Sequence, residues 1–223
     1  MSDEQRSPSD RVRLRRLPEL ASYDKEAIYG ILDATSVCHV GVVVDGHPLV
    51  LPSLHVRIGD TLVLHGSQSS HLLRSMVEGP GVCVTVTLVD GLIVARSTFN
   101  SSVAYRSVVV FGSARLVSDE EERRSVLDAL VEGLLPGRLS EVRASSESEL
   151  RRTGIVVVDI EDASAKISAG PPEDDEEDVA GHAWAGVIPL VQKAGAPIPA
   201  PDGIVGDGLV EIPPSVRRFV DLR

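Results

Sequence analysis

From Val82 to Leu88 the chain alternates strictly between aliphatic residues and cysteine or threonine. A period of two is typical of a strand that buries one face. The Asp90-Gly91 pair that follows predicts a two-residue hairpin turn, with residues 92–96 as the returning strand. This stretch constrains the chain to contain an antiparallel sheet.

Two further short turns, Asp45-Gly46 and Gly59-Asp60, separate apolar segments in the first half of the sequence. Segments typical of strands lie at 37–44, 48–54, 61–65, 106–117, 155–160 and 165–168. Strands joined by short turns predict an antiparallel meander, and closing it wholly or partly into a barrel hides the strand edges. The predicted fold class is therefore mostly β with peripheral helices.

Helical spacing of apolar residues appears in a few segments between these strands. The first, ending near Ala34, has Ser22 or Asp24 as its cap, and a second spans about 70–78 before Gly79-Pro80-Gly81. Ser118 with Glu121 forms a capping box that predicts a third helix, and a shorter helix is expected to end near residue 153.

Composition limits the classes of function. The hydrophobic content of 43% suffices for a sizeable core, and the aromatic content of 3% requires a core of aliphatic residues. The net charge of −11 argues against a general nucleic-acid or anionic-membrane binder. Because no apolar run reaches membrane-spanning length and no signal-peptide pattern opens the chain, we expect a soluble, cytoplasmic protein. Cys38 and Cys83 lie within apolar strand patterns and are expected to be buried free thiols.

Three regions are expected. Residues 1–20 form a flexible, basic N-terminal arm, and residues 21–190 form the folded domain. Residues 191–223 form an irregular tail that packs on the domain or on a partner subunit. The acidic run 173–178 has no metal-ligand spacing, so it is expected to be a solvated loop.

The loop after residue 65 is rich in serine and leads into a helix. The unpaired N–H groups of a first helical turn attract anions, and the hydroxyl groups of Ser67, Ser69 and Ser70 are further donors. His71 or Arg74 would add positive charge. The alternative is that serine is only the N-cap, which is the more common situation.

Three blocks occur in order: LVLHGSQSSHLL at 62–73, VCVTVTLVDGLIVARS at 82–97 and YRSVVVFGSARLV at 105–117. Together they resemble the FMN-binding split β-barrel proteins related to pyridoxamine 5'-phosphate oxidase, in the branch that includes the 5-nitroimidazole reductases. The resemblance covers about residues 20 to 190. It implies an antiparallel split β-barrel and a homodimer with FMN sites at the subunit interface.

The resemblance also implies which residues contact the flavin. Along the flavin ring we expect Val50, Leu51, Pro52 and Ser53. At the ring edge and the ribityl chain we expect His65, Gly66 and Ser67. At the phosphate we expect Ser70 and His71, with Arg74 one turn further on. Arg106 and Ser107 match a strand that reaches the partner's flavin, Lys166 matches a flavin-proximal lysine, and Trp184 stacks near the ring or is a buried anchor. Where the oxidase has Ser-Arg-Lys, this chain has Ser70-His71-Leu72, so one titratable group replaces two fixed charges.

No nucleophile–base pair is recognisable, so the chemistry is expected to belong to the cofactor. The first hypothesis is an FMN-dependent oxidoreductase acting on a small organic substrate, although the basic C-terminal substrate segment of the oxidase itself has no match. The second is a flavin carrier or sensor without turnover. A haem-binding split barrel, with His65 or His182 as the iron ligand, and a deazaflavin-binding protein are further alternatives.

Overall fold

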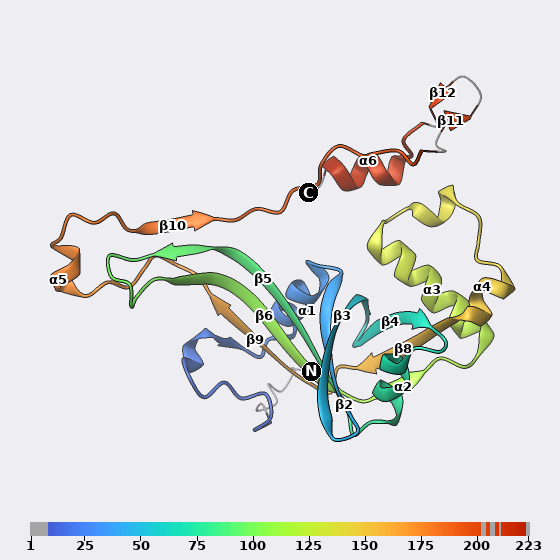
Figure 1. The fold of residues 1–223 in the computed structure, drawn as a ribbon, viewed down its shortest axis with the longest axis horizontal. Coiled ribbons are helices and arrows are strands. Elements are labelled where there is room, and N and C mark those ends of the chain that lie inside the picture. Colours follow the sequence, from blue (N-terminus) through green and yellow to red (C-terminus); the bar gives the residue numbers. More distant parts are fainter. Residues whose placement is uncertain (1–8, 202–203, 206–207, 210, 222–223) are drawn as a thin grey trace, which may run out of the picture.

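The structure is a computed structural model that describes residues 9–201, 204–205, 208–209 and 211–221. Its main sheet is antiparallel throughout and open, since the terminal strands β1 and β7 of the described chain do not pair with each other. This confirms the split-barrel prediction, in its partly closed form (Figure 1). The strands follow the order β1 (Ala21–Ser22), β9 (Asp162–Ser168), β6 (Ser102–Gly112), β5 (Val82–Val94), β2 (Val37–Val44), β3 (His47–Ile58), β4 (Thr61–Ser67), β8 (Thr153–Asp159) and β7 (Ala114–Leu116).

The strand β3 joins the two halves of the sheet. Its first part pairs with β2 as far as Leu54, and its second part pairs with β4 from His55 onwards. The main core lies inside this curve, where β2, β4, β5, β6 and β8 contribute buried valine and leucine side chains. A smaller core, which includes Val63, Leu130 and Ile155, lies on the other side of β4 and β8.

Helices cover these two cores. α1 (Lys25–Asp33) is capped by Asp24, which accepts a hydrogen bond from Ala27 N at 2.8 Å, and α2 (His71–Glu78) is capped by Ser70. α3 (Glu120–Leu134) begins one residue later than predicted, because the Asp119 carboxylate, rather than Ser118, accepts from Glu122 N. The remaining helices are η1 (Pro18–Leu20), η2 (Arg138–Glu141), α4 (Glu147–Arg152), α5 (Glu176–Val179) and α6 (Pro214–Asp221).

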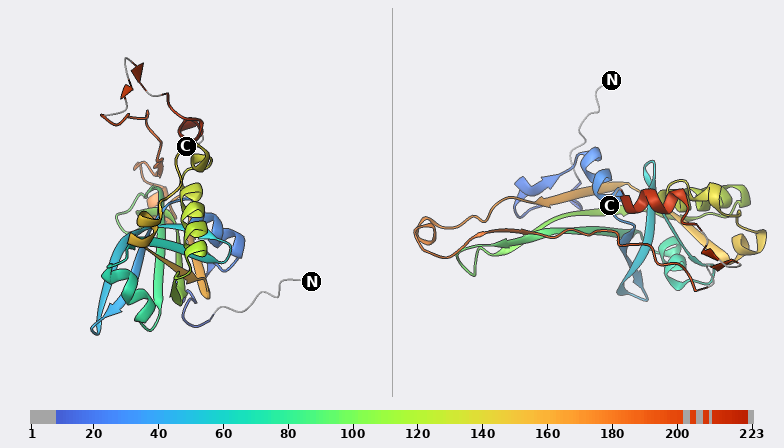
Figure 2. Two further views of the ribbon diagram at one scale, coloured as in Figure 1. Left: turned by 90° about the vertical axis from the view of Figure 1, so that its right-hand side faces the viewer. Right: turned by 90° about the horizontal axis from the view of Figure 1, so that it is seen from above.

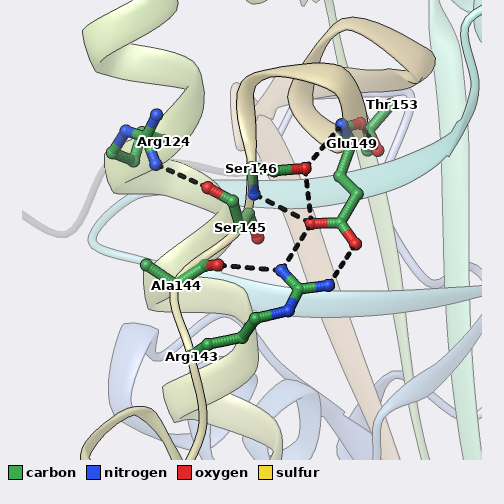
Figure 3. Close-up of polar contacts among 7 residues, drawn as sticks. All are labelled: Arg124, Arg143, Ala144, Ser145, Ser146, Glu149 and Thr153. Carbon is green, nitrogen blue, oxygen red and sulfur yellow. Dashed lines mark hydrogen bonds and ion pairs between the residues drawn. The ribbon is translucent and has the colours of Figure 1, made fainter.

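The start of α4 is a capping box built on Ser146 and Glu149 (Figure 3). Arg143 donates two hydrogen bonds to the Glu149 carboxylate, at 2.8 and 2.6 Å. These bonds, with those from Ser146, hold the pKa of Glu149 well below its usual range. Arg124 of α3 donates to the Ser145 carbonyl at 2.8 Å, so the network fixes α4 against α3.

The Asp90-Gly91 pair is not a hairpin turn, which corrects the sequence prediction. β5 continues to Val94, with an irregularity between Val89 and Gly91, and residues 92–94 belong to the same strand. The cause is β10 (Gly186–Pro189), which pairs with β5 in this region. A Cβ on Gly91 would lie 2.8 Å from the Ile188 carbonyl oxygen, so the close approach of β10 requires glycine here.

Other predicted boundaries also shift. The long strand expected at 106–117 is broken at Ser113 into β6 and β7, because β7 pairs with β8 whereas β6 pairs with β9. The described chain also contains β11 (Ile204–Val205) and β12 (Gly208–Leu209). No helix in the described ranges is long and apolar enough to cross a membrane.

Residues 169–201, here named the arm, leave β9 and run through α5 and β10 along a ribbon that projects from the barrel (Figures 1 and 2). The tail then reaches α6, which was not predicted. Ser215 N donates to Glu141 Oε1 at 2.8 Å, and Arg218 Nη2 donates to the Pro136 carbonyl at 3.1 Å, so α6 is attached beside η2. The division into three regions stays a prediction.

Both cysteines are free thiols, as predicted. Cys38 is fully buried, and burial raises its pKa to about 12. Cys83 is only half-buried, because it lies on the outer face of β5, and burial raises the pKa of its thiol as well.

Candidate functional site

The first predicted site residues lie on β3, where it pairs with β2. Register places Leu51 opposite Val40, which is fully buried. Because strand side chains alternate, Leu51 and Ser53 lie on the core side, whereas Val50 and Pro52 lie on the outer face. Val50 is 62% exposed. Val50 and Pro52 are therefore accessible to a ligand on the outer face, whereas Leu51 and Ser53 lie on the opposite face of the strand.

The same outer face brings together two further predicted residues. Ser107 of β6 pairs with Lys166 of β9 and with Thr87 of β5, so the three side chains form one row across the strands. The Lys166 ammonium lies 6.0 Å from the centre of the Tyr105 ring. This row is a polar strip with one cationic side chain, Lys166. Thr87 was not predicted, since only the strand register reveals it.

Arg106 lies on the opposite face of β6 from Ser107. Its Nε and Nη2 donate to the two carboxylate oxygens of Asp90, each at 2.8 Å. These bonds lower the pKa of Asp90 and raise that of Arg106. The pair lines a cavity of about 500 Å3, together with Lys193 and Phe219 from the C-terminal part of the chain. The structure thus does not place Arg106 beside Ser107, as their adjacency in sequence had suggested.

The serine-rich loop before α2 is an ordered turn. Ser67 Oγ and Ser69 Oγ lie 2.9 Å apart, and Ser70 N donates to the Ser67 carbonyl at 2.9 Å. Ser70 Oγ accepts from Leu73 N at 3.4 Å, which makes Ser70 the N-cap. The capping role is therefore present, and it leaves the Ser67 and Ser69 hydroxyl groups exposed at the helix start.

His71 and Arg74 are exposed on the first turn of α2. Neither side chain has a hydrogen-bond or ion-pair partner among the described residues; the bond from Ser75 Oγ to His71 is accepted by the backbone carbonyl. Two free cationic or donor groups next to a helix N-terminus suit a phosphate group.

Gly66 has a packing role. It pairs with Gly154 across β4 and β8, and Leu73 of α2 packs against both. A Cβ would lie 3.3 Å from Leu73 Cδ1 at Gly66 and 3.1 Å from it at Gly154. The two glycines let the start of α2 approach the sheet, which explains the position of the loop without a ligand.

His65 pairs with Ile155, which belongs to the smaller core under α3. The imidazole therefore points to the α3 side of the sheet. Its Nδ1 is buried and has no hydrogen-bond partner among the described residues. The prediction that His65 faces a ligand stays untested.

Trp184 is far from this loop in the same chain. It precedes β10 by two residues and is 65% exposed, so it is not a buried anchor here. In Figure 1 the α5 end of the arm lies at one end of the molecule, well away from α2 in the barrel part, and Figure 2 agrees from above.

The acidic run 173–178 is not wholly solvated, which corrects the prediction. The Asp174 side chain is 1% exposed and accepts hydrogen bonds from Arg96 N and Arg96 Nη1, both at 2.7 Å. This ion pair fixes the arm to the end of β5. No cluster of metal-ligating side chains occurs in the part of the chain that the structure describes.

Comparison with known proteins identifies the family of this chain. The family model described as pyridoxamine 5'-phosphate oxidase matches residues 24–167. The chain belongs to this flavin-binding family. No curated protein gives a significant match.

Solved structures extend the likeness beyond the barrel. The flavocytochrome Anf3 from Azotobacter vinelandii is 39% identical, with a TM-score of 0.89 over 95% of this chain and 97% of that one. The FAD and heme binding protein from Mycobacterium smegmatis is 42% identical, with a TM-score of 0.85 over 90% of this chain and 97% of that one. A Bacteroides thetaiotaomicron protein named for 5-nitroimidazole resistance is 23% identical, with a TM-score of 0.56 over 66% of this chain and 86% of that one, and shares the fold.

Proposed function

We propose that this protein is a redox flavoprotein that binds a haem in addition to its flavin. The observation that supports this most is the extent of the similarity to the Azotobacter and Mycobacterium proteins. The family model ends at residue 167, and residues 1–167 are about three quarters of the chain. Matches that cover 95% and 90% of the chain must therefore include part of the arm and tail.

The flavin that we propose is FAD, in place of the FMN expected from the sequence, because the Mycobacterium relative is named for FAD. The described residues fit a flavin nucleotide. His71 and Arg74 would hold its phosphate end, and the Thr87–Ser107–Lys166 row with Val50 would bind the ring side. A terminal phosphomonoester carries about −1.5 to −2 charge at pH 7. Each phosphate of the FAD pyrophosphate is doubly substituted and carries a single negative charge, which matches the one fixed positive charge of Arg74.

The histidines limit where a haem can bind. His55 is excluded, because it is 1% exposed and its Nε2 donates to the Leu32 carbonyl at 3.0 Å. Of the two ligands expected from the sequence, His65 has an enclosed Nδ1, whereas His182 is exposed on the arm beside Trp184. We therefore assign the iron to His182. A haem bound there would supply one-electron chemistry, with the flavin as the two-electron partner.

The polypeptide itself would position these groups. No nucleophile–base pair stands out among the described residues, which is consistent with an oxidoreductase whose chemistry lies in its cofactors. The outer face of the barrel would exclude water from one side of the flavin ring. We further propose a homodimer with its flavin sites at the subunit interface.

Two single variants test the proposal. Purified wild-type protein is expected to show both flavin and haem absorbance, and mass spectrometry of the denatured protein to release both groups. His182→Ala is expected to lose the haem band and keep the flavin. His71→Ala is expected to lose flavin and keep the haem. A protein that takes up neither cofactor, or a His182→Ala variant with full haem content, would contradict the respective assignment.

A further inference from the structure

The cavity of about 500 Å3 between the barrel and the C-terminal part of the chain is within the size range of small-molecule sites. Its barrel side is formed by residues 88–90 of β5 and by Arg106 of β6. Its other side is formed by residues 192–194 of the arm and by Phe219 of α6. Among the residues proposed above for the flavin, only Thr87 also borders this cavity, because Arg106 lies on the face of β6 opposite the flavin row. The cavity is therefore a separate candidate site.

The chain is anchored on both sides of the segment that borders the cavity. Leu190 N donates to the Asp90 carbonyl at 2.9 Å, and Lys193 follows Leu190 by three residues. Further along the chain, α6 is held by the bond from Ser215 N to Glu141 Oε1. In Figure 1 the chain between β10 and α6 runs along the side of the molecule on which β5 lies. These contacts hold Lys193 beside the residue that pairs with Arg106.

Two cationic side chains of this cavity can still donate hydrogen bonds. Arg106 uses Nε and Nη2 for the two carboxylate oxygens of Asp90, so its Nη1 has no partner among the described residues. The exposed ammonium group of Lys193 has no hydrogen-bond or ion-pair partner in the same part of the chain. Two positive charges and the one negative charge of Asp90 leave a single positive charge in excess.

The charge and the lining of the cavity favour a monoanion with an apolar body. Guanidinium and ammonium groups both form charge-assisted hydrogen bonds to carboxylates. One carboxylate balances the excess positive charge, whereas a phosphate monoester, with a charge of about −1.5 to −2 at pH 7, would exceed it beside Asp90. Leu88, Val89 and the Phe219 ring line the cavity and give apolar surface to the rest of the ligand.

We propose that this cavity binds a small monocarboxylic acid with an aromatic or aliphatic body, whose carboxylate lies between Arg106 and Lys193. The two cations belong to different parts of the chain, so the ligand joins the barrel to the arm and orders the arm where it borders the cavity. The proposal goes beyond the flavin and the haem proposed above, and it depends on neither of them.

Isothermal titration calorimetry of the purified full-length protein with benzoate tests the proposal. Benzamide is the matched neutral ligand, since it has the same ring and nearly the same shape, and phenyl phosphate is the ligand with the higher charge. We expect benzoate to bind at one site per chain, and we expect both other ligands to bind about tenfold more weakly or worse. Hydrogen exchange in residues 190–201 is expected to slow when benzoate binds.

Variants locate the binding site. Lys193→Gln is expected to weaken benzoate binding about tenfold and to leave benzamide binding unchanged, because only the charged ligand uses the ammonium group. Arg151→Gln is the control, since it removes one positive charge from an exposed side chain of α4, outside the cavity. The double variant Arg106→Gln with Asp90→Asn tests the barrel side without leaving the Asp90 carboxylate unpaired, and a similar loss is expected.

Four results separate the outcomes. A wild type that does not bind benzoate at millimolar concentration, or a Lys193→Gln variant that binds it as tightly as the wild type, would overturn the proposal. An equal loss in Arg151→Gln would also overturn it, by showing a general attraction of anions. Displacement of benzoate by haem or FAD would assign the cavity to a cofactor instead. A protein that binds benzoate here but takes up neither cofactor would support this inference and refute only the proposed function.

Discussion

At the scale of single residues, His71 and His39 are both exposed but lie at different distances from the proposed phosphate. His71 begins α2, whereas His39 lies on β2 opposite Pro52. A hydrogen bond to a charged group contributes about 1.5–3 kcal/mol. We expect His71→Ala to weaken flavin binding about 10-fold to 100-fold in a fluorescence titration, and His39→Ala to have a clearly smaller effect. Equal affinities would contradict the placement of the phosphate.

His55 links stability to pH. Burial lowers its pKa, although the Leu32 carbonyl opposes that shift. In the unfolded chain the pKa of His55 is near its ordinary value of about 6.5, so the unfolded chain binds a proton more readily than the folded chain. The contribution of His55 to the free energy of unfolding is therefore complete above about pH 6.5 and is lost as the pH falls below that value. We expect urea unfolding between pH 7 and 5.5 to show a loss of up to about 1.4 kcal/mol per pH unit from this group. His55→Asn is expected to be less stable overall but to have a shallower slope; an unchanged slope would exclude His55 as the source.

Residue types and their spacing predicted the buried valines, because alternation is a local property of the sequence. The partners of the charged groups were not predictable in this way. Nothing in the acidic run distinguishes Asp174 from its neighbours, and its partner Arg96 is 78 residues away. The partner of Arg106, Asp90, is on the neighbouring strand, and only the register of β5 and β6 shows that they meet.

At the scale of elements, two glycines are expected to respond in opposite directions to alanine. A Cβ on Gly112 would lie 1.8 Å from the Asp159 carbonyl oxygen, where β6 passes close to β8. A Cβ on Gly30 of α1 would meet nothing within 4 Å. We expect Gly112→Ala to lower the free energy of unfolding by about 3 kcal/mol or more, and Gly30→Ala to raise it by about 0.5–1 kcal/mol, both measured by chemical denaturation. A neutral Gly112→Ala would contradict the close packing of these strands.

The ion pair between Asp174 and Arg96 is expected to control the arm. Because Arg96 remains partly exposed, loss of the ion pair should lower the free energy of unfolding by about 1–3 kcal/mol, which is less than for a fully buried pair. Asp174→Asn is expected to speed hydrogen exchange and proteolysis in residues 180–201 and to leave the barrel strands protected. Asp175→Asn is the matched control, since that side chain is exposed and makes no capping bond. Identical exchange in the two variants would show that the pair does not hold the arm.

Elements formed by neighbouring segments were largely predictable from sequence, including α1, α2, β2 and the two turns that flank β3. The hairpin predicted at Asp90-Gly91 was wrong, because the usual signal for a turn was outweighed by pairing with β10, about 100 residues later in the chain. The same long-range contact explains why the continuous β5 was missed. Helix α6 was missed because a sequence rich in proline and glycine precedes it.

At the scale of the whole molecule, the split barrel followed from the short turns and from the resemblance of three blocks, and the structure confirms it. The distribution of the candidate site over the molecule did not follow from either. Sequence order placed Ser107 with Arg106 and left Trp184 without a location. The fold instead joins Ser107 to Lys166 and carries Trp184 to the far end of the ribbon.

We propose that one polypeptide chain binds both a flavin and a haem. The most direct measurement is the absorbance spectrum of the purified full-length protein, oxidised and then reduced with dithionite, with mass spectrometry of the groups released on denaturation. We expect flavin bands that bleach on reduction, a haem Soret band that shifts, and FAD with haem among the released groups. A protein that releases flavin alone and fails to take up added haem would contradict the claim and leave a simple flavoprotein.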